Sequence, residues 1–296
     1  MQNLRRIIFC FLFATFNSFS GELSVCTWNL EWFPSGSSKG FASKEIESKR
    51  ISLVAETLRK LNCDIIIVQE IRDRKACEDL VEELKPNTYT ISVCTQFKEG
   101  FGGAVGLQQI AILSKIPATA SWAENWNTVS ISDPPRGFAF ASYRIGTNDI
   151  GVYGVHLKSN LIRGDVDRGR QLNILKRELA AEKIIRHINE SPFNKTNQLE
   201  VVIVGGDFNT TLDQNEFASE RTLTIFQDNQ FESGYKSVEL KQRITIPGKG
   251  KYPDATFDYL FVRPKPISSK PIITPVSVSD HYPVVRTIGF KNTNQN

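Results

Sequence analysis

Short runs of β-branched and apolar residues alternate along this chain with longer segments in which apolar residues recur every three or four positions. The short runs predict buried strands, and the helical period predicts amphipathic helices. Helices are predicted over residues 45–61, 74–84, 165–189 and 216–228. Strands are predicted over residues 23–28, 64–69, 88–94, 108–113, 137–145, 150–156, 201–204, 256–263 and 282–288.

Many strands with only a few helices predict packed sheets with helices outside, because several strands follow one another without an intervening helix. The chain has 296 residues, of which 40% are hydrophobic. That is ample for a single α/β or β-sandwich domain with a sizeable core. We find no internal repeat and no linker.

The first twenty residues differ from the rest. Arg5 and Arg6 precede an apolar run over 7–16, and small residues follow at 18–20. This pattern is typical of a signal peptide, and the run is too short for a comfortable membrane span. We therefore predict a signal peptide over 1–20, a single domain over 21–296, and a secreted or periplasmic protein. A retained N-terminal anchor is the alternative.

Removal of residues 1–20 would lower the formal charge from +4 to +2, since that segment holds two arginines and no acids. This mild charge permits a nucleic acid or an anionic lipid as partner without demanding either. Four cysteines would remain, which allows two disulfides in an oxidising compartment. We expect Cys26 and Cys63 to be buried thiols, and we favour Cys77 with Cys94 if any bridge forms.

One apolar strand, over 201–204, ends at Gly205 and Gly206 and is followed by Asp207 and Asn209. Ligands and catalytic groups of α/β proteins tend to lie at such strand ends. A carboxylate and a carboxamide two residues apart in extended chain point the same way. A plain Asx-turn without chemistry is the alternative reading of this segment alone.

The same arrangement, a polar side chain at the end of an apolar strand, recurs at Asn29, Glu70, His156, Asp258, Asp280 and His281. Such a set suits the attack of water on a phosphate ester. Glu70 is a hard oxygen ligand of the kind that Mg²⁺ prefers, and Asp207 could orient or deprotonate the water. Asn29 and Asn209 could donate hydrogen bonds to phosphate oxygens.

Five short motifs occur in the order and wording of the endonuclease/exonuclease/phosphatase superfamily, and the resemblance covers residues 23–290. They are Trp28-Asn29, Gln69-Glu70, Gly206-Asp207-Phe208-Asn209, Phe257-Asp258-Tyr259 and Ser279-Asp280-His281-Tyr282-Pro283-Val284. The resemblance implies a four-layer α/β sandwich: two mainly antiparallel sheets face to face with helices outside. It also implies an active site where the strand ends of both sheets meet.

The resemblance implies roles for the matched residues. Asn29, Glu70 and Asp280 are similar to the metal ligands, for Mg²⁺ first and Mn²⁺ or Ca²⁺ as alternatives. Asp207 and Asn209 resemble the pair that orients water and binds phosphate.

The histidines also have counterparts in the superfamily. His281 resembles the phosphate-contacting histidine that Asp258 holds, and a carboxylate there fixes the tautomer and keeps the ring charged. His156 is similar to the histidine that the deoxyribonuclease branch places beside the scissile phosphate. That branch supports it with a glutamate, whereas Gln108 or Gln109 stands here, and an amide does not hold an imidazolium as a carboxylate does.

The secreted deoxyribonucleases are the branch that the chain resembles most. Arg72 follows the metal carboxylate, where that branch sends an arginine into the DNA minor groove, and Arg136 matches a phosphate-binding arginine. Lys158 and Asn160 depart from that branch but could reach a phosphate. We predict these four residues to bind substrate.

The sequence thus predicts a secreted, monomeric, metal-dependent phosphodiesterase that cleaves DNA, or RNA, as an endonuclease. A lipid-active relative, such as a sphingomyelinase or a phosphoinositide phosphatase, is the alternative. Its membrane contact would have to come from residues 97–101 or 122–126. A binding protein that keeps the fold without catalysis is disfavoured, because binding alone would not require the complete polar set.

Overall fold

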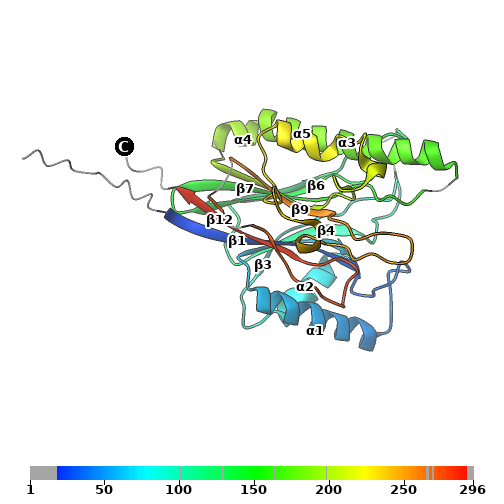
Figure 1. Ribbon diagram of the computed structural model, residues 1–296. Coiled ribbons are helices and arrows are strands. Elements are labelled where there is room, and N and C mark those ends of the chain that lie inside the picture. Colours follow the sequence, from blue (N-terminus) through cyan, green and yellow to red (C-terminus); the bar gives the residue numbers. More distant parts are fainter. Residues whose placement is uncertain are drawn as a thin grey trace, which may run out of the picture.

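Two β-sheets pack face to face, and helices cover the outer face of each (Figure 1). The computed structural model describes residues 19–291 except 101, 128–129, 163, 198, 265–266 and 269. The predicted signal peptide, apart from its last two residues, lies outside this range. The two facing sheets with helices outside confirm the predicted four-layer α/β sandwich.

The first sheet has seven strands, with β11 (Ile272–Ile273) paired to β12 beside the main path. Its main path runs β10 (Ile267–Ser268), β12 (Val284–Lys291), β1 (Phe19–Phe33), β2 (Ile65–Ile71), β4 (Gln109–Ser114) and β3 (Thr90–Cys94). Only the β1–β2 pair within it is parallel.

The second sheet has five strands and a single parallel pair, β7–β8. Its order is β5 (Ala120–Glu124), β6 (Phe138–Ile145), β7 (Asn148–His156), β8 (Val201–Asp207) and β9 (Asp258–Arg263).

The helices form the outer layers. Helices α1 (Lys44–Leu61) and α2 (Arg74–Glu83) cover the first sheet; α3 (Val166–Glu190), α4 (Pro192–Asn197) and α5 (Thr222–Asp228) cover the second (Figure 1). Capping side chains start the three long helices: the oxygens of Ser43, Asp73 and Asp165 accept hydrogen bonds from backbone N–H groups of the first turns.

Strand β2 shows why its sequence is apolar throughout. Ile65 and Ile67 belong to the core between the sheets, whereas Ile66 and Val68 belong to the core under α1 and α2. Successive side chains of a strand point to opposite faces, so a strand that is covered on both faces loses the usual alternation with polar residues.

The two glycines of β8 permit close approach on either side of the strand. A Cβ at Gly205 would lie 2.6 Å from Ile67 Cδ1 and 2.7 Å from Leu260 Cδ2. A Cβ at Gly206 would lie 2.0 Å from the carbonyl oxygen of Val155. Any larger residue would therefore force β8 away from its neighbours, and with it Asp207, the last residue of the strand.

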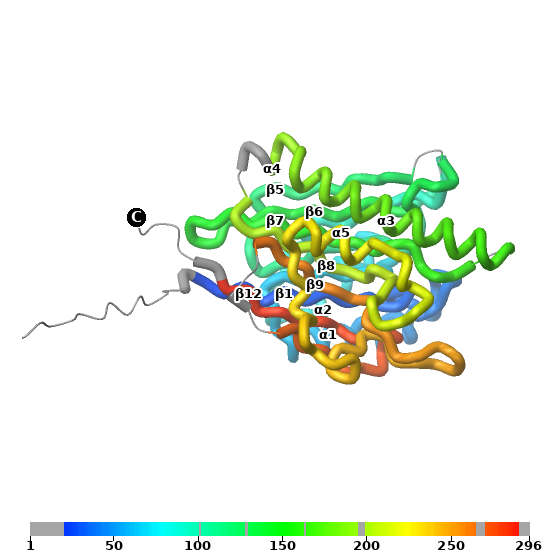
Figure 2. Tube along the Cα trace, turned by 45° about the horizontal axis from the view of Figure 1, so that its top comes forward, coloured from blue at the N-terminus to red at the C-terminus, as the bar shows by residue number. Residues whose placement is uncertain are grey.

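The strand register sets three predicted site residues side by side. His156 on β7 pairs with Asp207 on β8, and Asp207 in turn pairs with Asp258 on β9. Figure 2 shows β8 and β9 passing next to β1 of the other sheet. The polar strand ends thus gather at one edge of the sandwich.

The predicted helix over 216–228 is wrong in its first half. The chain there makes a 3₁₀ turn, Asn215–Phe217, and α5 begins only at Thr222. Between them the Glu220 side chain turns inward, which interrupts the helix. Five short elements were not predicted, because two to six residues are too few to show a period: β5, α4, β10, β11 and a 3₁₀ turn over Leu240–Gln242.

Two smaller predictions concern loops and cysteines. Residues 98 and 105 form an antiparallel bridge, which closes the glycine-rich segment between them into a hairpin. Cys77 and Cys94 lie side by side as thiols with their Sγ atoms 3.5 Å apart. Their oxidation to a disulfide stays a prediction.

Within the described part of the chain, no helix is both long and apolar enough to cross a membrane.

A buried ion pair joins α3 to the segment before α5. Arg177 donates from Nε and Nη2 to the two carboxylate oxygens of Glu220, at 2.7 and 2.6 Å, and both side chains are 1% exposed. Nη1 of Arg177 also donates to the carbonyl oxygen of Lys158 and to Oδ1 of Asn160, both at 2.9 Å.

Glu220→Ala is expected to lower the free energy of unfolding by about 3–5 kcal/mol, because it leaves the charge of Arg177 buried without its carboxylate partner. Urea denaturation measures the change. Glu239→Ala is the matched control: its pair with Lys241 is exposed and is worth less than about 1 kcal/mol. Equal effects of the two substitutions would contradict a stabilising role of the buried pair.

Candidate active site

Three charged groups meet at the ends of β8, β9 and the loop before β12. Ligand atoms of Asp207, Asp258 and His281 all lie within 4.8 Å of one another, and all three residues are buried. The tightest contact joins Nδ1 of His281 to Oδ2 of Asp258 at 2.8 Å. Nε2 of the same ring lies 3.9 Å from Oδ2 of Asp207. The imidazole is thus held at one nitrogen and directed toward Asp207 by the other.

The first sheet contributes Asn29 and Glu70. Nδ2 of Asn29 donates to Oε1 of Glu70 at 3.2 Å and to Oδ2 of Asp207 at 3.1 Å. The other oxygen of Glu70 accepts from the backbone N–H of Trp32 at 3.0 Å. One amide therefore links the carboxylates of the two sheets, so the site exists only where the sheets meet.

The backbone is special at two of these positions. Glu70 has φ 58° and Asn209 has φ 54°, in the left-handed region that residues with a Cβ seldom adopt. Asn209 is held there by its N–H, which donates to Oδ1 of Asp207 at 2.8 Å, and by Nδ2, which donates to the carbonyl of Leu157 at 3.3 Å. Strain of this kind clusters at functional sites, where surrounding contacts over-determine the conformation.

The loop that carries His281 is fastened to β1. Ser279 Oγ donates to the carbonyl of Asn29 at 2.7 Å and accepts from the N–H of His281 at 3.1 Å. Nε1 of Trp28 donates to the carbonyl of His281 at 2.9 Å. The motif residues Trp28 and Ser279 therefore serve to position the histidine.

The surroundings move the pKa values of Asp207 and His281 in a way that suits proton transfer. Burial raises the pKa of Asp207 to about 7, although the charge of His281 opposes the rise. Burial by itself lowers the pKa of His281, but the charges of Asp258 and Asp207 outweigh it and raise the value to about 10. Near neutral pH the site thus combines a fixed imidazolium with a carboxyl group that can take up or release a proton.

His156 lies in the same cluster but differs in charge state. Its Nε2 is 3.6 Å from Oδ2 of Asp207 and 3.8 Å from Oε1 of Glu70. Burial, and then the charge of Arg136, hold its pKa well below the usual range. Its buried Nδ1 has no hydrogen-bond partner among the described residues. A neutral ring at this place is a hydrogen-bonding group rather than a cation.

Neither glutamine discussed for the place behind His156 bonds to its ring. Oε1 of Gln108 accepts from Arg136 at 2.6 Å. Gln109 is bonded to Thr95 and to the backbone of 97 and 106, so it braces the glycine-rich hairpin. The expectation that His156 lacks carboxylate support from this position therefore agrees with the geometry.

The predicted arginines have different settings. Arg136 donates to the carbonyl of His156 at 3.3 Å. Burial lowers the pKa of its guanidinium, and the charges of Glu70 and Asp207 offset part of that lowering. It therefore adds a positive charge to the site. Arg72 instead pairs with Glu47 at 2.6 Å and stacks over Phe41 at 4.8 Å. Its contact with DNA stays a prediction, since its present partners belong to the chain itself.

Lys158 and Asn160 lie on the loop after β7. Nζ of Lys158 donates to the oxygens of Ser159 at 2.9 and 3.1 Å. Nδ2 of Asn160 donates to the carbonyl of Asn209 at 2.9 Å, while its oxygen accepts from Arg177. Asn160 therefore supports the backbone of Asn209, and its predicted phosphate contact would come in addition to that role.

The donor set fits a hard divalent cation. Of the three predicted metal contacts, Glu70 is hydrogen-bonded to Asn29, and Asp280 lines the cavity that opens at this place. Mg²⁺ requires only one or two carboxylates and otherwise keeps its waters. Burial, and to a smaller extent the charge of Asp258, raises the pKa of Asp207, and a cation bound nearby would lower it. The ion's identity stays a prediction.

Sequence reasoning missed two supporting groups. Glu31 follows Asn29 by two residues, and burial and then the charge of Asp280 raise its pKa. Its position between two strand-end motifs could have revealed it. The Arg177–Glu220 pair holds the loop of Asn160, but each residue lies in a segment with ordinary helical charges, so no local signal points to them.

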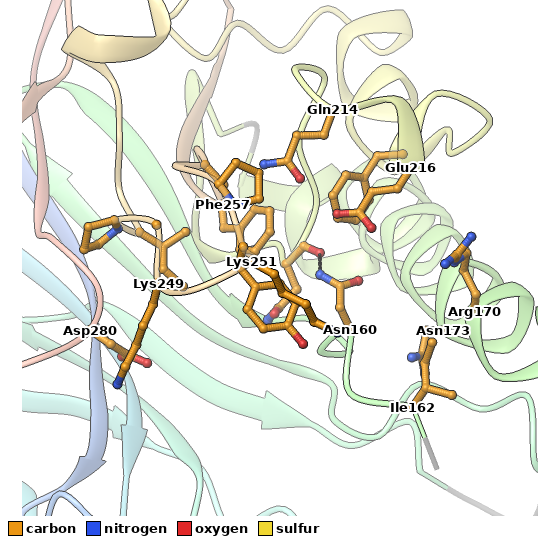
Figure 3. A pocket seen from close by; sticks show the side chains of 18 of the residues that line it. Asn160, Ile162, Arg170, Asn173, Gln214, Glu216, Lys249, Lys251, Phe257 and Asp280 are labelled. Carbon is orange, nitrogen blue, oxygen red and sulfur yellow. Dashed lines mark hydrogen bonds between the residues drawn. The ribbon is translucent and has the colours of Figure 1, made fainter. Parts of the chain in front are cut away.

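A cavity of about 950 Å³ adjoins the cluster. Asp280 lines one end of it, and it extends past Asn160 to Arg170 on α3 (Figure 3); Asn209, which contacts Asn160, is also part of the lining. The strand-end residues therefore lie beside a space large enough for an extended ligand rather than a small ion alone.

Structural comparison places the chain among proteins of one fold. An endonuclease/exonuclease/phosphatase family protein from Leptotrichia buccalis superposes with a TM-score of 0.64 at 16% identity, covering 90% of this chain and 100% of that one. A family protein from Bacteroides thetaiotaomicron gives 0.64 at 14% identity, with 92% and 99% covered. Truncated TDP2 from Caenorhabditis elegans gives 0.59 at 17% identity, with 91% and 98% covered.

A comparison of the sequence with curated proteins found no match. A comparison with sequence models of protein families did find one. The sequence model of the endonuclease/exonuclease/phosphatase family matches residues 26–281, which include every predicted site residue from Asn29 to His281. A match over that length shows that the chain belongs to the endonuclease/exonuclease/phosphatase family.

Proposed function

We propose that this protein is a metal-dependent phosphodiesterase that cleaves nucleic acid, DNA in the first place, as a monomer outside the cytoplasm. The observation that carries the proposal is the pair of Asp207 and His281, whose pKa values are driven apart to about 7 and about 10. Two neighbouring groups separated in this way are suited to be the base and the fixed charge of one reaction.

The chain's own groups provide most of the steps. Nε2–H of the His281 imidazolium donates to a phosphate oxygen, where negative charge increases in the transition state. Asp207 accepts a proton from the attacking water while the oxygen of that water bonds to phosphorus. The P–O bond on the opposite side then breaks, and the leaving oxygen takes a proton from water. Asn209, held by Asn160, and Arg136 add hydrogen-bond donors near the same phosphate.

A divalent cation held by Glu70 with Asn29 would supply Lewis-acid stabilisation of the phosphate and its leaving oxygen. His156, neutral at this depth, orients a phosphate oxygen or the water without carrying a charge. The cleavage of an internal bond, as in an endonuclease, is supported by the cavity, since it leaves room for chain on one side of the reacting phosphate.

The lipid-active alternative loses support from the two segments considered for membrane contact. Phe97 and Trp126 are each only 4% exposed, within the core between the sheets. Trp122 packs against Phe140 with ring centroids 4.2 Å apart. These three aromatic side chains are used internally and are not offered to a bilayer. Phe101, the other aromatic residue of the first segment, lies outside the described residues.

Purified protein is expected to convert supercoiled plasmid to nicked and linear forms in the presence of Mg²⁺, and EDTA should abolish the reaction because the cation would be removed. Gel electrophoresis measures the conversion, with RNA and sphingomyelin as parallel substrates. Hydrolysis of sphingomyelin without nucleic-acid cleavage would replace the proposal by the lipid-active alternative. A lack of turnover on all three would contradict it outright.

Asp207→Asn and His281→Ala are expected to lower kcat by about a hundred-fold or more, because the first removes the base and the second the charge on phosphate. Hydrolysis of a small phosphodiester, bis(4-nitrophenyl) phosphate, measures kcat, and circular dichroism checks folding. Asp228→Asn, at the exposed end of α5, is the control and should be unchanged. Near-wild-type rates in either site variant would remove that residue from the mechanism.

A further inference from the structure

The cavity beside the cluster has one wall made by a hairpin that the proposed chemistry does not use. Bridges between 246 and 255 and between 249 and 252 close this hairpin, and Figure 2 shows it in orange, projecting from the body of the protein. It carries Lys249, Lys251 and Tyr252 into the cavity lining. Tyr252 is 67% exposed, although so large an aromatic ring is usually covered in a protein of this size.

The opposite wall comes from α3 and the loop before it. Arg170 and Asn173 lie across the cavity from Lys251, as Figure 3 shows. Aromatic surface completes the lining: Phe257 and Phe217 meet edge to face, with centroids 5.8 Å apart at 82°. The walls thus combine flat rings and side-chain amides with charged groups of both signs: four basic residues, of which Arg177 is paired with Glu220, and three acidic ones.

The path begins at the reacting phosphate. Asp280 lies at its inner end with Lys249 beside it in Figure 3, and Asn209, which also lines the path, donates its N–H to Asp207 of the catalytic cluster. Arg170 marks the far end. A ligand that enters from the cluster therefore passes Lys249, then the aromatic and amide groups, and reaches Arg170 beyond them.

This sequence of groups matches one nucleotide unit. Bases stack on aromatic side chains, and amides such as Asn173 and Gln214 can pair with base edges. Lysine or arginine then neutralises the next phosphate. Asn173 and Gln214 already donate to the carbonyls of Leu161 and Asp254. An acyl chain would still bring hydrocarbon against the carboxylate of Glu216, which also lines the cavity, and this is costly.

We propose that this cavity binds one unpaired nucleotide next to the scissile phosphate, with its base against Tyr252, and that the protein therefore prefers single-stranded nucleic acid. The identification of that phosphate rests on the proposed function. In a duplex both faces of a base are stacked and its pairing edge is occupied, so a base must leave the helix before it can use such a pocket. Duplex substrates would then be attacked at frayed or unpaired positions.

Equilibrium binding tests the inference without requiring hydrolysis. Fluorescence anisotropy of a labelled oligothymidylate, in EDTA to prevent cleavage, is compared with that of the same strand paired to oligoadenylate. The single strand is expected to bind about ten-fold more tightly or better. Tyr252→Ala should weaken its binding by about five-fold to a hundred-fold, the range of one lost base–aromatic stack of about 1–3 kcal/mol.

Two pairs of variants separate stacking and local charge from general effects. Tyr252→Phe keeps the ring and should bind as the wild type does. Lys251→Ala should weaken binding, whereas Lys75→Ala, on the exposed outer face of α2, should not. Circular dichroism confirms folding of each variant.

The outcomes distinguish this inference from the proposed function. Equal affinity for single strand and duplex, or no effect of Tyr252→Ala, would overturn the inference even if phosphodiesters are hydrolysed. Binding of sphingomyelin vesicles that depends on Tyr252, without oligonucleotide binding, would overturn it as well. Single-strand binding that depends on Tyr252, in a protein that hydrolyses no phosphodiester, would uphold the inference and refute the proposed function.

Discussion

The buried contact between Asp258 and His281 is the interaction on which the proposed chemistry depends. It keeps a positive charge on a ring that burial would otherwise neutralise. That charge in turn opposes the rise in the pKa of Asp207, so that it lies near 7 rather than higher. Neither residue would have its proposed role if Asp258 were absent, because the site would then hold a neutral histidine and an uncompensated carboxyl group.

The active-site cluster forms because the two sheets meet closely at one edge. Gly205 lets β8 approach β2 and β9, and Asn29 then reaches from the first sheet to the carboxylate of Asp207 in the second. The Arg177–Glu220 pair extends this order outward, since it holds the loop whose Asn160 supports Asn209. Core packing, a buried ion pair and the site thus form one connected arrangement.

Much of this could be predicted from the sequence, for local reasons. The apolar run over 201–204, followed by two glycines, predicted a buried strand with polar residues at its end. The long helices were predicted from the helical spacing of their apolar residues. The supporting contacts could not be predicted in the same way. The inward turn of Glu220 broke a predicted helix because a partner 43 residues away outweighed local propensity. The internal pairing of Arg72 with Glu47 likewise depends on how α1 lies against β2.

The pKa of His281 tests the central claim most directly. Histidine-selective NMR titration of the metal-free protein should show this ring protonated through neutral pH, with a midpoint near the value of about 10 that the geometry indicates. In Asp258→Asn the midpoint should fall below neutrality, since the charge that offsets burial is lost. An ordinary midpoint in the wild type, or the same midpoint in both proteins, would contradict the account.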